Sequence, residues 1–139
     1  MRVTRWYSPL VERLKIAEVL RTLETIADLE WAESDAARAH LYKRLDQGDL
    51  TPGAALEGYE DLIREVVRSP DSRVYLDPDD TRNEGAIAIT RDLGERGQWL
   101  VKVHGDVTIR TAFRVSSPGD AYVDDQGYDY IGTIREVLQ

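Results

Sequence analysis

The sequence contains no cysteine, and this absence excludes disulfide bonds, zinc–thiolate sites and cysteine nucleophiles. No run of apolar residues approaches the roughly 20 that a membrane-spanning helix needs. The first residues, MRVTRW, lack the apolar core of a secretory signal peptide, so we expect a cytoplasmic protein. The chain has 139 residues, the usual size of one domain, and we therefore expect a single domain over residues 1–139.

Positive charge is also scarce. Lysine and arginine together number 18 against 26 aspartates and glutamates, which gives a net charge of −8. Proteins that coat duplex nucleic acid depend on positive surface, so this balance argues against that class, although it leaves room for a small basic pocket. An acidic surface also suits a protein whose partner is basic.

Several common site motifs are missing as well. The glycines lack the spacing of phosphate-binding and dinucleotide loops, and there is no Gly-x-Ser-x-Gly elbow. The two histidines, His40 and His104, are 64 positions apart, and the acidic turn at 77–80 lacks the glycine and terminal glutamate of a calcium loop. We therefore expect neither a metal nor another cofactor.

The first half of the chain has the pattern of three helices. Apolar residues or good helix formers follow helical spacing over residues 9–29, 36–45 and 56–67. Serine, aspartate or threonine precedes each segment as a start signal, in two cases followed by proline. Gly48 and Pro70 end the second and third segments.

The second half has shorter, extended segments. We expect strands at 74–76, 86–90, 98–104 and 107–115, the last two joined by a tight turn as the central hairpin of a sheet. The tail at 131–138 fits either a strand or a helix. Because helices come first and strands second, the sequence predicts an α+β domain in which N-terminal helices pack on one face of a C-terminal antiparallel sheet of roughly four strands.

Alternation along the last predicted strand gives Thr111 an unusual place. It would share an apolar face with Ile109 and Phe113, whereas Arg110 and Arg114 would lie on the other face. We expect Ile109 and Phe113 to be buried against the preceding strand. A buried threonine hydroxyl needs a partner or a function, and the simpler interpretation is a satisfied core hydroxyl.

His40 stands out in the second predicted helix. Lys43 at i+3 and Arg44 at i+4 would share its helical face. A neutral imidazole can take a proton, and two cations can hold a phosphate. The alternative is an ordinary surface histidine in a helix of mixed charge.

The order of these segments resembles that of the phage-associated and toxin-like ribonucleases of the barnase, EndoU, colicin and RelE superfamily. The resemblance covers residues 36–117, and five segments carry it in order: ARAHLYKRLDQGDLTP, YEDLIREVVRSPD, RVYLD, AIAITRD and WLVKVHGDVTIRTAFRV. It implies metal-independent RNA cleavage. A base takes the 2′-hydroxyl proton, the oxygen attacks phosphorus, an acid protonates the departing 5′ oxygen, and fixed cations stabilise the added charge.

The resemblance also assigns roles to residues. His40 matches the helical histidine and would be the acid or base, and Thr111 would hydrogen-bond the phosphate. Arg44 and Lys43 match the basic residues after the histidine. Arg44 would belong to the catalytic group, and Lys43 would bind the substrate. His104 is a candidate second proton-transfer group. The remaining candidates for binding the substrate and stabilising its charge are Arg91 and Arg114.

An interaction protein without enzymatic activity is the competing hypothesis: an immunity protein, an antitoxin or a phage anti-defence factor. Its partner would be a basic protein, which a carboxylate-rich face would bind. The partner of the enzyme would instead be RNA. Under either hypothesis the protein could also have a cognate immunity or toxin protein. A regulatory module of a larger protein is not distinguishable from it by sequence. Clustering of His40, Arg44 and Thr111 in a concave pocket would favour the enzyme, and a separation of His40 and Thr111 below about 8 Å is the most informative observation. A continuous acidic surface with His40 exposed and isolated would favour the inhibitor. The candidate acidic face comprises Asp77, Asp79, Asp80, Asp120, Asp124, Asp125 and Asp129.

Overall fold

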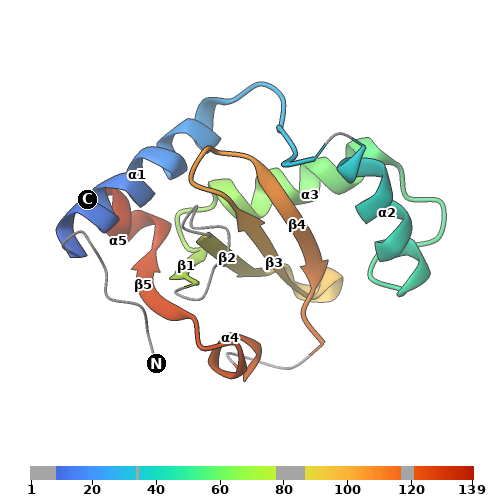
Figure 1. Cartoon of the computed structure of the whole chain (residues 1–139). Coiled ribbons are helices and arrows are strands. Elements are labelled where there is room, and N and C mark those ends of the chain that lie inside the picture. Colours follow the sequence, from blue (N-terminus) through green and yellow to red (C-terminus); the bar gives the residue numbers. More distant parts are fainter. Residues whose placement is uncertain (1–8, 34, 78–86, 117–120) are drawn as a thin grey trace.

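The computed structural model describes residues 9–33, 35–77, 87–116 and 121–139, with side chains from residue 14 onward. Helices occupy the N-terminal side of the chain and strands the C-terminal side (Figure 1). In chain order the elements are α1 (Pro9–Thr25), α2 (Ala36–Asp46), α3 (Leu56–Arg68), β1 (Arg73–Leu76), β2 (Ile87–Asp92), the 3-10 helix η1 (Gly94–Arg96), β3 (Gln98–Val103), β4 (Ile109–Arg114), α4 (Ala121–Asp125), β5 (Asp129–Thr133) and α5 (Ile134–Leu138).

The strands form one five-stranded sheet in the order β4-β3-β2-β1-β5, and every neighbouring pair is antiparallel. The predicted α+β class, with N-terminal helices on a C-terminal antiparallel sheet, is confirmed. The expected central position of the β3–β4 hairpin is wrong. The first four strands follow one another as neighbours, and β5 then pairs with β1, which leaves β4 at an edge.

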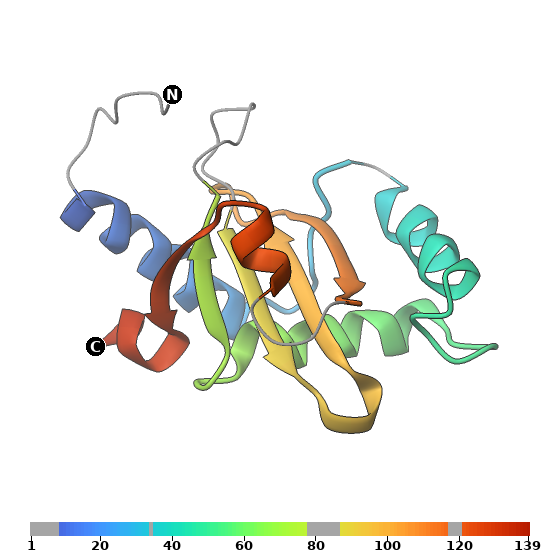
Figure 2. The same ribbon diagram turned by 90° about the horizontal axis from the view of Figure 1, so that it is seen from below.

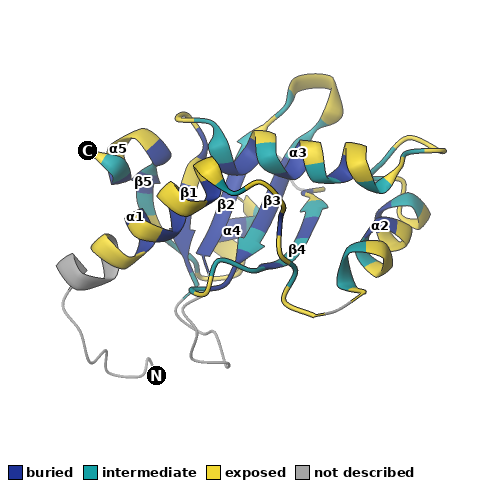
Figure 3. Ribbon diagram, turned by 90° about the horizontal axis from the view of Figure 1, so that it is seen from above, coloured by how far each residue is buried: buried dark blue, intermediate teal, exposed yellow. Residues whose placement is uncertain are grey.

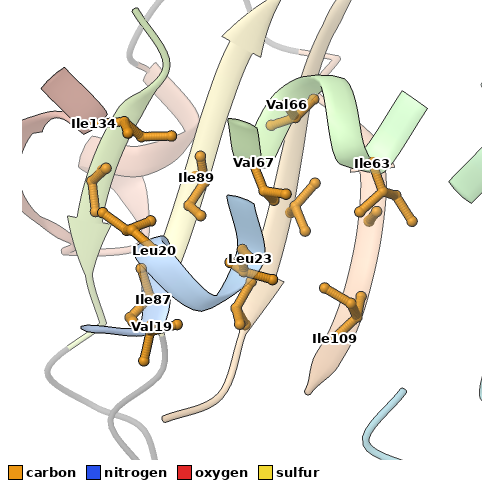
Figure 4. Packing of buried hydrophobic residues seen from close by; sticks show 14 of the residues in the cluster. Val19, Leu20, Leu23, Ile63, Val66, Val67, Ile87, Ile89, Ile109 and Ile134 are labelled. Carbon is orange, nitrogen blue, oxygen red and sulfur yellow. The ribbon is translucent and has the colours of Figure 1, made fainter. Parts of the chain in front are cut away.

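Two layers of helix surround the sheet. Helices α1 and α3 cover one face, and the short α4 lies on the other, as Figures 2 and 3 show from opposite sides. Within the described ranges no helix is long and apolar enough to cross a membrane. The main core fills the space beneath α1 and α3 (Figure 4), where residues of the two helices and the sheet pack together, among them Leu20, Leu23, Ile63, Val66, Val67, Ile87, Ile89 and Ile109.

Two segments differ from the sequence interpretation. Helix α1 ends at Thr25 rather than near Leu29, because the chain then turns towards β4 and buries Leu29 in the core on the way. The ambiguous tail contains both elements, a strand at 129–133 followed by α5. A capping box starts this helix: the Thr133 hydroxyl accepts from the Glu136 backbone, and the Glu136 carboxylate accepts from the Thr133 N–H.

A bulge corrects the alternation expected for β4. The register between β3 and β4 shifts by one residue at Arg110, so Ile109 points into the main core while Thr111 and Phe113 face the other side. A smaller group of buried residues forms a second core, separate from the main one. Phe113 is half-buried and packs in this second core with Leu100, its partner in register. The expected common face of Ile109, Thr111 and Phe113 is therefore wrong.

Other parts of the chain cover the edge of β4 that is not paired with β3. The Ile109 N–H donates to the Glu30 carbonyl at 2.6 Å, and the Ala32 N–H donates to the Ile109 carbonyl at 2.9 Å. Further along, the Tyr59 hydroxyl of α3 donates to the Ala112 carbonyl at 2.6 Å. These bonds satisfy three backbone groups of the edge strand, and the first two bring the segment before α2 alongside β4.

Candidate active site

Helix α2 packs beside β4, and the contact joins the two residues singled out in the sequence. His40 Nδ1 and Thr111 Oγ1 are 3.2 Å apart, within hydrogen-bond distance. The separation expected for a shared site was below about 8 Å. The structure therefore brings together two side chains that are 71 positions apart in the sequence.

An aromatic ring holds the imidazole from a second direction. Trp31 stacks on His40 with ring centroids 5.5 Å apart and an interplanar angle of 20°. The indole N–H donates to the Glu60 carboxylate at 2.9 Å, and the indole also contacts the ring of Tyr59. Because the Trp31 backbone is bridged to Ile109 of β4, the indole has a fixed position. The orientation of the imidazole is thus set by one hydrogen bond and one stacking contact.

The His40–Thr111 pair opens into a hollow of about 300 Å³. Its remaining lining comes from Arg110 and from the segment that leads into α2, including Glu33. A histidine, a threonine, an arginine and a glutamate thus line one concavity, a combination of residue types suited to proton transfer on a bound anion. The residues lining the hollow are Ala32, Glu33, Ala36, His40, Arg110 and Thr111.

The sequence analysis missed Arg110, and the reason is the bulge. Strict alternation places Arg110 and Thr111 on opposite faces, yet both line the hollow. A bulge redirects the side chain of the extra residue. Trp31 and Glu33 were also missed, because they lie in the non-helical segment between α1 and α2, which gave no periodic signal.

The surroundings of His40 favour its neutral form. Its pKa is lowered from 6.5, first by partial burial, then by the charges of Arg44 and Lys43, against a smaller opposing effect of Glu33. Among the described residues, the bond to Thr111 is the only side-chain hydrogen bond of the imidazole. If Nδ1–H donates to the Thr111 oxygen, Nε2 keeps a lone pair and can act as a base.

Arg44 lies on the inner side of α2 and does not line the hollow. It is 4% exposed, its Nη1 is 3.3 Å from Asp49 Oδ2, and its guanidinium lies 5.7 Å from the ring centroid of Phe113. A buried and paired cation cannot leave its partner cheaply for a phosphate. Arg44 therefore acts on His40 through its field, whereas Lys43 is exposed and reachable by a ligand.

The other three candidates lie apart from the hollow. His104 is 1% exposed at the end of the hairpin, where its backbone bonds Thr108 and Val107. Arg91 of β2 is opposite Trp99 in register, and its charge helps to lower the pKa of Glu65 on α3. The remaining candidate, Arg114, packs against Gly97. The structure thus groups only His40 and Thr111 of the expected catalytic set, with Lys43 close by.

The candidate acidic face has fewer available carboxylates than its sequence suggests. Asp77 is bound to Lys102 at 2.7 Å, with both side chains mostly buried. Asp124 and Asp125 are exposed on α4. Asp79, Asp80 and Asp120 lie outside the described residues. In the part of the chain with described positions, no group of three histidine, aspartate or glutamate residues is arranged to hold a metal ion.

Comparison of the chain with protein-family models, with curated proteins and with solved structures gives no match. The hollow and the residues that line it are therefore the basis for assigning a function.

Proposed function

We propose that this protein is a ribonuclease that cleaves RNA without a metal ion, by attack of the 2′-hydroxyl on the neighbouring phosphate. The observation that carries the proposal is the hydrogen bond between His40 and Thr111 in an open hollow that Arg110 also lines. The resemblance to the barnase, EndoU, colicin and RelE superfamily likewise expects these two residues to share one site, with His40 as acid or base and Thr111 near the phosphate.

In this mechanism His40 is the general base. With Nδ1–H donated to Thr111, Nε2 removes the proton from the 2′-hydroxyl, and the oxygen forms a bond to phosphorus. The bond from phosphorus to the 5′ oxygen breaks, and that oxygen takes a proton from water at the open side of the hollow. The products are a 2′,3′-cyclic phosphate and a free 5′-hydroxyl, and His40 returns its proton to solvent.

Arg110 and Thr111 have supporting roles. The phosphoryl oxygens gain negative charge as the 2′ oxygen attacks, and a fixed guanidinium beside them stabilises that charge. In this mechanism the Thr111 oxygen accepts from Nδ1–H, which stabilises the tautomer that leaves Nε2 free. Burial together with Arg44 and Lys43 keeps His40 neutral and able to accept a proton at pH 7.

The experiment is cleavage of mixed-sequence RNA by the purified protein in EDTA, beside a His40→Ala variant. Loss of a general base costs about 10²–10⁴-fold in rate, and alanine suits a helix. Arg110→Gln should also slow cleavage strongly, whereas Arg91→Gln, which removes an arginine apart from the hollow, should not. No cleavage by the wild type would contradict the proposal, and equal cleavage by wild type and His40→Ala would point to a contaminating nuclease.

A further inference from the structure

A second hollow, larger than the first, lies at the other end of α2. Its volume is about 760 Å³, and its walls come from the end of α2, the connection at 48–54, α3 and η1. It shares no lining residue with the hollow at His40, so the proposed mechanism does not use it. We call it the α3 groove. A concavity of this size is in the range of sites that bind ligands.

Part of the α3 groove is apolar. Its lining includes the buried Leu62 and Trp99 and the half-buried Leu45 and Leu50. The Trp99 indole N–H already donates to the Arg96 carbonyl at 2.8 Å, so the ring brings no unsatisfied donor to the groove. An apolar side chain placed here would therefore leave water without depriving a polar group of its hydrogen bond.

Most of the charges that line the α3 groove are paired within the fold. Three of the four lining carboxylates have an arginine partner. The pairs are Glu65–Arg96, with two bonds of 2.8 and 2.9 Å, Asp61–Arg64 at 3.0 Å and Asp49–Arg44 at 3.3 Å. Because each pair is neutral, these residues give the groove no strong attraction for ions of either sign.

Two lining charges of opposite sign remain, the carboxylate of Glu95 and the guanidinium of Arg114. Both residues are exposed, and within the described ranges neither side chain makes an ion pair, a hydrogen bond or a ring contact. Gly97, which follows η1, leaves the space in which the Arg114 guanidinium lies, because a Cβ there would overlap it. A ligand that supplies one charge of each sign beside an apolar group would complement the groove.

Gly58, in the first turn of α3, keeps one wall of the groove open. A Cβ at this position would meet no atom within 4 Å, and the backbone there is not in the left-handed region. Packing therefore does not require glycine at position 58, and alanine would suit the helix better. The missing side chain leaves room in the groove for another molecule.

We propose that the α3 groove binds a segment of a partner protein in which an apolar side chain lies between one acidic and one basic residue. The apolar side chain would pack on Leu45, Leu50 and Leu62. The acidic residue would pair with Arg114 and the basic residue with Glu95. A short stretch of polypeptide presents three such groups close together, and the inference is independent of the proposed ribonuclease function.

The test selects random dodecapeptides displayed on phage against the immobilised wild type and, in parallel, against Gly58→Trp, whose indole would occupy the groove. Peptides enriched on the wild type should contain an apolar residue between an acidic and a basic one. In fluorescence anisotropy, Gly58→Trp should raise the Kd of an enriched peptide about 10- to 150-fold, the range for loss of one buried apolar side chain. Gly58→Ala should retain affinity, since its Cβ meets no atom.

Charge reversal tests the ion pair with Arg114 separately. Arg114→Glu should raise Kd about 2- to 5-fold, the value of one exposed ion pair, and replacing the acidic residue of the peptide by lysine should restore affinity. Arg38→Glu is the matched control, because Arg38 is an exposed arginine on α2 that does not line the groove, and it should leave Kd unchanged.

Three results would overturn the inference: no enrichment on the wild type over Gly58→Trp, enriched peptides without the charge pattern, or equal effects of Arg114→Glu and Arg38→Glu. Cleavage of RNA by Gly58→Trp at the wild-type rate, with peptide binding lost, would support a site separate from the hollow. Peptide binding that depends on Gly58 and Arg114 without any RNA cleavage by the wild type would support the inference and contradict the ribonuclease mechanism.

Discussion

Tyr59 is the residue whose replacement tests most cleanly how the fold holds the site. Its side chain is fully buried on α3, and its hydroxyl donates to the carbonyl of Ala112 at 2.6 Å. Ala112 follows Thr111 on the edge strand, so this bond fixes the part of β4 that contacts His40. Tyr59→Phe removes one oxygen and preserves the ring.

The expected loss of stability follows from burial. Phenylalanine keeps the ring contacts with Trp31 and Trp99, whose centroids lie 5.9 and 6.4 Å from that of Tyr59, so the lost hydrogen bond dominates. A buried acceptor without its donor costs about 1–3 kcal/mol in free energy of unfolding. At about 4 °C per kcal/mol for a domain of this size, Tm should fall by about 4–12 °C.

Urea unfolding of wild type and Tyr59→Phe measures this directly, with equal m-values confirming that only stability has changed. Burial also raises the pKa of Tyr59 well above 10, so the unfolded chain releases the phenol proton first. The contribution of Tyr59 to the free energy of unfolding is therefore present below pH 10 and is lost as pH rises above 10. Tyr59→Phe has no phenol to titrate and should lack this pH dependence. A loss below about 0.5 kcal/mol at pH 7 would refute the role assigned to the hydroxyl.

Two further predictions concern His40 and Gly97. The lowered pKa of His40 should give an NMR titration midpoint below 6.5, and Lys43→Gln should raise the midpoint; a midpoint at or above 6.5 would contradict the electrostatic argument. Because the unfolded histidine protonates first, His40 should also lower stability as pH falls below 6.5. Gly97→Ala should cost about 1–3 kcal/mol, because φ 88° with ψ −177° is a backbone conformation that essentially only glycine adopts, whereas the exposed Arg114 side chain that a Cβ would meet can move aside. Gly48→Ala, at φ 77° with no atom near the added Cβ, should cost about 1–2 kcal/mol; a larger loss at Gly48 than at Gly97 in urea unfolding would contradict this order.

The fold class was predictable from sequence because the spacing of apolar residues indicates which face of a helix or strand is buried. The apolar residues of α3 at 56–67 lie on one face, and the structure buries that face against the sheet. Each strand up to β4 also lay near its expected position. The order of strands was not predictable, because the place of β5 beside β1 depends on long-range pairing that no local pattern encodes.

The candidate site was half predictable. His40 was singled out for the cations at i+3 and i+4, and Thr111 for an apolar face that the bulge in β4 overturns, yet the structure puts the two side chains in contact. The sequence did not identify Arg110 as a site residue, because one extra residue in β4 changes which side chains point towards α2. Arg44 shares the predicted helical face of His40, but helical spacing does not distinguish a cation that faces solvent from one that is buried against Asp49.

A DNA oligonucleotide that contains a single ribonucleotide isolates the proposed reaction, because only one phosphate then has a neighbouring 2′-hydroxyl. The 2′-hydroxyl mechanism predicts that the wild type cleaves at that position alone in EDTA, leaving a 2′,3′-cyclic phosphate detectable by mass spectrometry, and that His40→Ala is about 10²–10⁴-fold slower. Cleavage at deoxyribonucleotides, a requirement for added metal, or an undiminished rate in His40→Ala would contradict it.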